Sequence, residues 1–184
     1  KLITKHFFQR KGLITMKCTS AEAAKILRKL NEDYSALCFN EEQSKEFLAA
    51  TGEDIESVRP VYDYEEMQKM LCELEDKIRR VKHAINVFNT VQTVPDFDMT
   101  IDQMLVFIPQ LTSRKRKLSI MRNKLPKTRE HGSAAGRMGI IDYRYTNYDI
   151  EKADADYNEV SELLAKAQTA LDVINNTALL ELDI

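Results

Sequence analysis

The sequence contains no tryptophan and is poor in glycine and proline, with five glycines and four prolines among 184 residues. So few turn-forming residues argue against a sandwich of many short strands. With 43% hydrophobic and 30% charged residues, the chain is also too apolar to be disordered. The composition therefore favours a single helical domain.

Cysteine, long apolar runs and net charge are scarce as well. The three cysteines, Cys18, Cys38 and Cys72, form no CxxC pair and leave one thiol unpaired under any disulfide scheme, so we expect a reducing, cytoplasmic compartment. No apolar run reaches the roughly 18 residues of a membrane-spanning helix, and no membrane partner is expected. The net charge of −2 gives the whole chain no field that would attract polyanions.

The common catalytic and nucleotide-binding signatures are missing. The sequence has no HExxH, no GxSxG, no Walker A motif and no GxGxxG after a predicted strand. The three histidines, His6, His83 and His131, have no partner at a metal-ligand spacing. We therefore predict no catalytic residue, no metal site and no cofactor, and expect the protein not to be an enzyme.

Two segments repeat apolar residues at alternating intervals of three and four, which is typical of heptad helices. The first runs from Tyr64 to Phe88, and each apolar position of the second, from Ile150 to Ile174, lies 86 residues after its counterpart. An aspartate precedes each segment and suits the N-cap of a helix.

The segments before these helices match at an offset of 81 residues. Sequences beginning at Thr19 and Thr100 both fit the capping box, so we predict helices over about residues 20–48 and 101–125. Pro109 lies inside the second of these helices and is expected to bend it.

Both offsets are explained by a duplicated helical hairpin, with repeats over about residues 18–90 and 99–177. The predicted fold is mainly α, a four-helix bundle or an antiparallel coiled coil. Residues 1–17 are expected to be an upstream arm or a translated leader, with Met16 as the native start. Residues 18–184 would then form a single helical domain.

The two linkers between first and second helices have the composition of short strands. Residues 58–62 contain valines, a tyrosine and a proline, and residues 140–146 are β-branched and aromatic. Because the linkers are equivalent in the repeat, we predict that they pair as a small two-stranded ribbon that packs on the helices.

One segment has a local positive field. Residues 113–129 hold eight basic residues and no acidic one, and could contact an anion or a nucleic acid. Residues 149–184 hold nine acidic residues against two lysines, so internal pairing of the two helices is favoured over nucleic-acid binding. The candidate contacts are Arg114, Lys115, Arg116, Lys117 and Arg129.

Residues 131–139 follow this basic helix and contain three of the five glycines. Backbone amides of such a loop can hold an anion, with Arg129 and Arg137 as further contacts. A simple connection is the favoured role of the loop.

Short motifs resemble those of a family of small bacterial proteins often labelled septicolysin. The resemblance covers about residues 64–182, and its motifs are Ile85-Asn86-x-x-Asn89-Thr90, Thr100-Ile101-Asp102-x-x-Leu105 and Ile174-Asn175-Asn176-Thr177. Members of that family carry Asn-Trp-Thr near the last motif, whereas this chain has no tryptophan, which suggests a distant branch. The resemblance implies a bacterial, cytoplasmic, helical protein, and it carries over no activity and no catalytic residue.

These observations predict a non-enzymatic interaction or scaffolding module that forms a homo-oligomer or binds another protein. The alternative is a nucleic-acid-binding protein that uses the basic helix 113–129. An enzyme with an anion site at the glycine-rich loop is the least favoured hypothesis.

Overall fold

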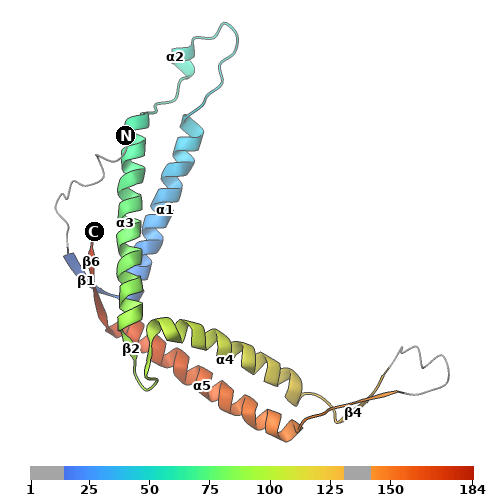
Figure 1. Ribbon diagram of the computed structural model, residues 1–184. Coiled ribbons are helices and arrows are strands. Elements are labelled where there is room, and N and C mark those ends of the chain that lie inside the picture. Colours follow the sequence, from blue (N-terminus) through green and yellow to red (C-terminus); the bar gives the residue numbers. More distant parts are fainter. Residues whose placement is uncertain (1–14, 131–141) are drawn as a thin grey trace, which may run out of the picture. The chain divides into compact units, whose positions relative to one another are not determined.

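The computed structural model describes residues 15–130 and 142–184, and this part of the chain is mainly helical with small two-stranded antiparallel sheets (Figure 1). The predicted mainly α fold class is therefore confirmed. In chain order the elements are β1 (Thr15–Thr19), α1 (Ser20–Ser44), α2 (Ile55–Val58), α3 (Tyr64–Val91), β2 (Thr93–Val94), β3 (Met99–Thr100), α4 (Ile101–Arg122), β4 (Lys127–Arg129), β5 (Tyr143–Tyr145), α5 (Ile150–Thr177) and β6 (Leu179–Asp183).

The four long helices begin at the predicted capping residues. The hydroxyl of Thr19 accepts a hydrogen bond of 3.2 Å from the Glu22 amide, and the Glu22 carboxylate accepts one of 2.8 Å from the Thr19 amide. The same two bonds form around Thr100 at 3.3 and 2.9 Å. Asp63 and Asp149 accept hydrogen bonds from first-turn amides of α3 and α5. These contacts satisfy amides that have no partner inside the helix.

Two helices end earlier than predicted. α1 stops at Ser44 rather than near residue 48 because residues 45–50 are all exposed, so a longer helix would bury no apolar surface. α4 stops at Arg122 rather than near residue 125, since Pro126 disfavours helical backbone at the preceding residue. α4 continues through Pro109, and the bend expected there stays a prediction.

The structure divides into two compact units, residues 15–92 with 174–184, and residues 93–173. In the first, α1 and α3 pack antiparallel. The Tyr34 hydroxyl donates to Glu75 over 3.1 Å, and seven residues further along α1, Glu41 accepts from Gln68 over 2.7 Å. The contacts thus move forward along α1 and backward along α3.

In the second unit, α4 and α5 pack as the corresponding antiparallel pair. Arg122 forms an ion pair of 3.0 Å with Asp154, and the Tyr148 hydroxyl donates to the Met121 carbonyl over 2.8 Å. Lys115, two turns earlier in α4, lies over the ring of Tyr157, one turn later in α5.

The heptad positions supply the buried faces of both second helices, as the spacing predicts. In α3 the buried residues are Leu71, Val81 and Phe88. In α5 they are Ala153, Val160, Leu164, Ala167 and Ile174. All eight lie on the predicted seams.

Two of the sheets pair a strand that precedes a first helix with a strand that follows a second helix. β1 pairs with β6, with Thr19 opposite Leu179 and Cys18 opposite Leu180. β3 pairs with β2, with Thr100 opposite Thr93 and Met99 opposite Val94. Moving the β1 residues forward by 81 positions and the β6 residues back by 86 positions gives the pairing of β3 with β2.

The third sheet corrects the predicted ribbon. β5 falls inside the expected strand 140–146, but its partner is β4 rather than residues 58–62, which form no strand. Both strands therefore come from the second linker. Pairing within one linker closes a short loop and so costs less chain entropy than pairing between two linkers, and Pro60 lacks an amide to donate.

Candidate interaction site

The linker of each helix pair and the adjoining helix turns form an end with charge of one sign. We call residues 41–66 the acidic end, because they hold nine acidic and two basic residues. We call residues 113–130 and 142–148 the basic end, because they hold nine basic and two acidic residues. In Figure 1, α2 lies at the end of the α1–α3 pair that is far from β1. Likewise, β4 lies at the end of the α4–α5 pair that is far from β2.

Polar contacts to the helix pair fix the linker of the acidic end. The Tyr62 hydroxyl donates to Glu41 over 2.9 Å, and Gln68 donates to the same carboxylate oxygen. Burial, followed by the hydrogen bond to Glu41, raises the pKa of Tyr62. Asp54 caps the short helix α2. The hydrogen bond of Tyr62 therefore ties the end of the linker to the last turns of α1.

Large apolar side chains are exposed at this acidic end. Leu48 is 96% exposed and Val61 is fully exposed, and Phe47, Ile55 and Tyr64 are also open to solvent. Several large exposed apolar side chains in one linker make this end a candidate contact surface for other molecules.

Most of the negative charge here has no basic partner. Lys45 pairs with Glu42 at 2.7 Å and Arg59 with Glu56 at 2.8 Å. These are the two basic residues of the acidic end, and Lys69 of α3 pairs with Glu66 at 3.6 Å. The other six of the nine carboxylates keep the surface negative.

The basic end is built around the β4–β5 ribbon. Arg144 makes two hydrogen bonds to Glu130, at 2.9 and 3.1 Å, which hold the strands side by side. The Lys127 ammonium lies 3.9 Å from the ring centroid of Tyr143 and 5.3 Å from that of Tyr145. Both rings are exposed, so this end combines aromatic surface with positive charge.

The structure brings the sequence-predicted residues to this end, with one exception. Arg114, Arg116, Lys117 and Arg129 are exposed, whereas Lys115 is half-buried against Tyr157. Arg137 and the glycine-rich loop lie outside the described residues, so their predicted anion site stays a prediction.

The expectation that α5 neutralises much of the basic helix is wrong for the described residues. Within residues 15–130 and 142–184, the ion pair that joins α4 to α5 is Arg122 with Asp154. No described carboxylate pairs with Arg114, Arg116 or Lys117. The reason is geometric, because these three side chains are on the exposed part of α4, whereas its buried positions there are Leu111 and Leu118.

Sequence reasoning missed the acidic end as a surface. The carboxylates around Glu66 lie next to the heptad positions of α3, and their spacing alone indicates a solvated helix face. The signal that could have found the surface is the excess of acidic residues in 41–66 together with apolar residues that lie off the heptad seam, such as Leu48 and Val61.

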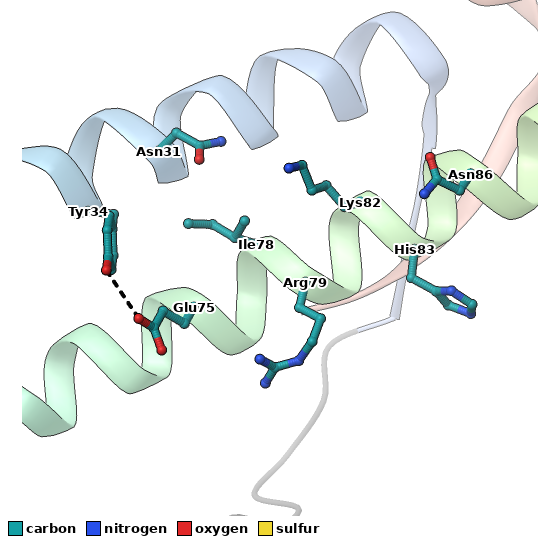
Figure 2. Close-up of a pocket in the computed structure, with 8 residues that line it drawn as sticks. All are labelled: Asn31, Tyr34, Glu75, Ile78, Arg79, Lys82, His83 and Asn86. Atoms are coloured by element: carbon teal, nitrogen blue, oxygen red, sulfur yellow. Dashed lines mark hydrogen bonds between the residues drawn. The ribbon is translucent and has the colours of Figure 1, made fainter.

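A shallow pocket of about 520 Å³ lies between α1 and α3 (Figure 2). The residues that line it are Asn31 and Tyr34 from α1, and Glu75, Ile78, Arg79, Lys82, His83 and Asn86 from α3. The Glu75 carboxylate accepts a hydrogen bond from the Tyr34 hydroxyl, and Arg79 forms an ion pair with Asp76. The hydrogen bonds to Cys38 and then Glu75 raise the pKa of Tyr34 to about 12, so this phenol stays protonated at neutral pH. The pocket is thus a polar depression in which Tyr34, Glu75 and Arg79 are already engaged with other side chains.

The thiols and the acidic residues form no reactive or metal-binding cluster within the described residues. Cys18, Cys38 and Cys72 are free, and burial followed by the charge of Glu22 raises the pKa of Cys18, which makes that thiol a poor nucleophile. In the part of the chain that the structure describes, no three metal-ligating side chains cluster. No helix there is long and apolar enough to cross a membrane.

The fold defines a protein of paired antiparallel helices, and the comparisons with known proteins agree at that level. The chain is similar to a solved structure described as a functionally unknown conserved protein from Corynebacterium diphtheriae. That match has a TM-score of 0.57 and 18% sequence identity, and it covers 91% of this chain and 99% of that chain. It therefore shows the fold alone.

No protein-family model matches the chain. No curated protein matches it either. The resemblance to proteins labelled septicolysin stays a prediction.

Proposed function

We propose that the protein is a non-enzymatic interaction module whose partner contacts lie at the acidic end and the basic end. The observation that carries this proposal is the exposure of Leu48 and Val61 among carboxylates that have no basic partner. Burying such side chains against a partner stabilises a complex by roughly 1.5 to 3 kcal/mol each. The unpaired charges would give the contact its specificity.

We also propose that the protein is bacterial, that it is located in the cytoplasm and that it arose by an internal duplication. A bacterial, cytoplasmic protein fits the three free thiols and the septicolysin-like motifs. An internal duplication of the helical hairpin is supported by the two capping boxes and the two equivalent strand registers. A further equivalence is that Tyr62 and Tyr148, 86 residues apart, both donate a hydrogen bond to the last turns of the preceding long helix.

Site-specific photocrosslinking tests the interaction module. A crosslinking residue would replace Leu48 or Tyr145 at the two ends, and Lys25 or Glu162 on exposed helix faces as matched controls. We expect protein adducts from the end positions and much weaker ones from the controls. Equal labelling from all four positions, or no adduct from either end, would contradict the proposal.

Nucleic-acid binding is a second candidate, favoured by the exposure of Arg114, Arg116 and Lys117 without an ion pair in the described residues. Phosphate contacts make affinity fall steeply with salt, by about 0.9 log units per log unit of salt for each phosphate neutralised. A binding titration against duplex and single-stranded DNA at several salt concentrations tests it. Neutralising the three residues should weaken binding and reduce the salt slope, and unchanged binding would exclude this surface.

A further inference from the structure

The acidic end and the basic end occupy the same position in their helix pairs and carry opposite charge. Each contains described residues of the linker from a first to a second long helix. Nine acidic residues stand against two basic ones at the acidic end, and nine basic against two acidic at the basic end. The net charge of −2 conceals this division because the two ends cancel.

The two surfaces also complement each other in their apolar parts. The acidic end exposes Leu48 and Val61, and the basic end exposes Tyr143, Tyr145 and Leu125. Tyrosine and arginine are enriched in protein interfaces, where aromatic and apolar contacts form the centre and charges form the rim. A contact between these ends would bury both apolar groups and neutralise both charges.

We propose that the acidic end of one copy of this chain binds the basic end of a second copy. The inference rests on the proposed interaction function and names its partner. A nucleic acid would match the basic end but would leave the exposed leucine and valine of the acidic end without a role. A second copy accounts for both surfaces with one contact.

Such a contact is heterologous, because it joins two different surfaces. Two copies form a closed dimer if both contacts are made at once, and otherwise the copies join head to tail into longer assemblies. In either case association depends on concentration and weakens as salt screens the charges. The screening length falls from about 10 Å at 0.1 M salt to about 3 Å at 1 M.

Light scattering coupled to size-exclusion chromatography provides the first measurement, on the full chain. At about 0.1 M salt we expect the mass of a dimer or a larger assembly, and at about 1 M salt a shift toward the monomer. A monomer of 21.2 kDa at all salt and protein concentrations would overturn the inference. Protein adducts that still formed in the photocrosslinking experiment would then leave the interaction function standing with a different partner.

Charge reversal at each end separates this contact from its alternatives. One variant carries Glu46→Lys and Glu65→Lys at the acidic end, and a second carries Lys124→Glu and Arg129→Glu at the basic end. All four residues are exposed. Each variant alone should associate about tenfold more weakly, because two reversals lower the net charge of the altered end from seven to three.

Restoring the complementarity is the decisive step. An equimolar mixture of the two variants keeps one native contact and should form a mixed dimer. The variant with all four reversals lowers the net charges of the two ends to −3 and +3 and should associate more weakly than either variant alone. Lys25→Glu with Lys166→Glu, two exposed lysines away from both ends, is the control and should associate as the unmodified chain does.

Failure of the mixture to form the mixed dimer would overturn the inference even if the single variants lose association. A nucleic-acid contact predicts a different pattern, in which association follows the basic residues alone and disappears after nuclease treatment. Circular dichroism of every variant verifies that the helices remain folded, so that loss of association is not loss of structure.

Discussion

Arg122 of α4 forms an ion pair with Asp154 of α5, 3.0 Å between Nη1 and Oδ1, at the place that Glu41 and Gln68 occupy in the α1–α3 pair. The offsets of 81 and 86 residues relate the two contacts, so the same register is held by a charge pair in one helix pair and by an amide and a carboxylate in the other. The Arg122 guanidinium also lies 3.8 Å from the ring centroid of Tyr157.

Substitution of these residues should separate the two interactions of Arg122. Arg122→Ala removes both the ion pair and the contact with Tyr157 and should cost about 1 to 2 kcal/mol of unfolding free energy. Asp154→Asn removes the charge alone and should cost less than about 1 kcal/mol, because its side chain is 52% exposed. Urea unfolding measures both, and equal losses would show that Tyr157 contributes nothing.

The two capping boxes differ in one titratable group and so provide a pH test. The hydrogen bond from the Thr19 amide lowers the pKa of Glu22 below its usual value of 4.5, whereas the second box uses Gln103, which does not titrate. A lowered folded-state pKa means that this stabilisation is complete above pH 4.5 and is lost as the pH falls through the folded-state pKa.

We therefore expect Glu22→Gln to be less stable than the unmodified chain at neutral pH and equal to it in acid. The reciprocal variant Gln103→Glu should gain an acid-sensitive contribution at the second box. Denaturant unfolding at a series of pH values measures both. A stability difference for Glu22→Gln that is the same at every pH would contradict the assignment.

The helix starts could be predicted from sequence because capping is local. Thr19 with Glu22 and Thr100 with Gln103 satisfy amides within three residues, and nothing distant is needed to define them. The seam from Tyr64 to Phe88 was visible for a similar reason, since burial follows the helical period.

The sequence could not show which partner each strand and charge would find. β5 was anticipated, yet it pairs with β4 through a local loop rather than with the other linker. Arg114 and Lys117 are recognisable as basic in the sequence, but only the structure shows that they are exposed and form no ion pair with a described carboxylate of α5. Leu48 and Val61 are apolar residues of the kind usually found in a core, and only the structure shows that the linker exposes them to solvent.

Strand β6 offers a matched pair of leucines that tests the first unit. Its residues alternate between exposed and buried, so Leu182 is fully buried while Leu179 is 60% exposed. Leu182→Ala should cost about 2 to 5 kcal/mol because it removes transfer energy and leaves a cavity. Leu179→Ala should cost less than about 1 kcal/mol.

Thermal or denaturant unfolding of both variants checks this prediction. Similar losses for the two leucines would mean that β6 does not pack on α3 with the alternation seen here. A loss confined to Leu182 would show that this last strand is part of the core of the first unit.

Ser161 of α5 should be replaceable with a gain in stability. Its hydroxyl oxygen is buried and has no hydrogen-bond partner within the described residues. Leaving a polar group buried without a partner costs about 1 to 3 kcal/mol, and alanine also favours the helix. Ser161→Ala should therefore raise the free energy of unfolding by about 1 kcal/mol and the melting temperature by about 2 to 4 °C.

Ser35→Ala in α1 is the control, since the Ser35 hydroxyl is exposed and donates to the Asn31 carbonyl. Its effect should stay within about 0.5 kcal/mol, as for most surface substitutions. If Ser161→Ala destabilised the chain, the hydroxyl would have to be making a hydrogen bond after all. Differential scanning calorimetry on the three proteins distinguishes these outcomes, because a satisfied and an orphaned hydroxyl change stability in opposite directions when the oxygen is removed.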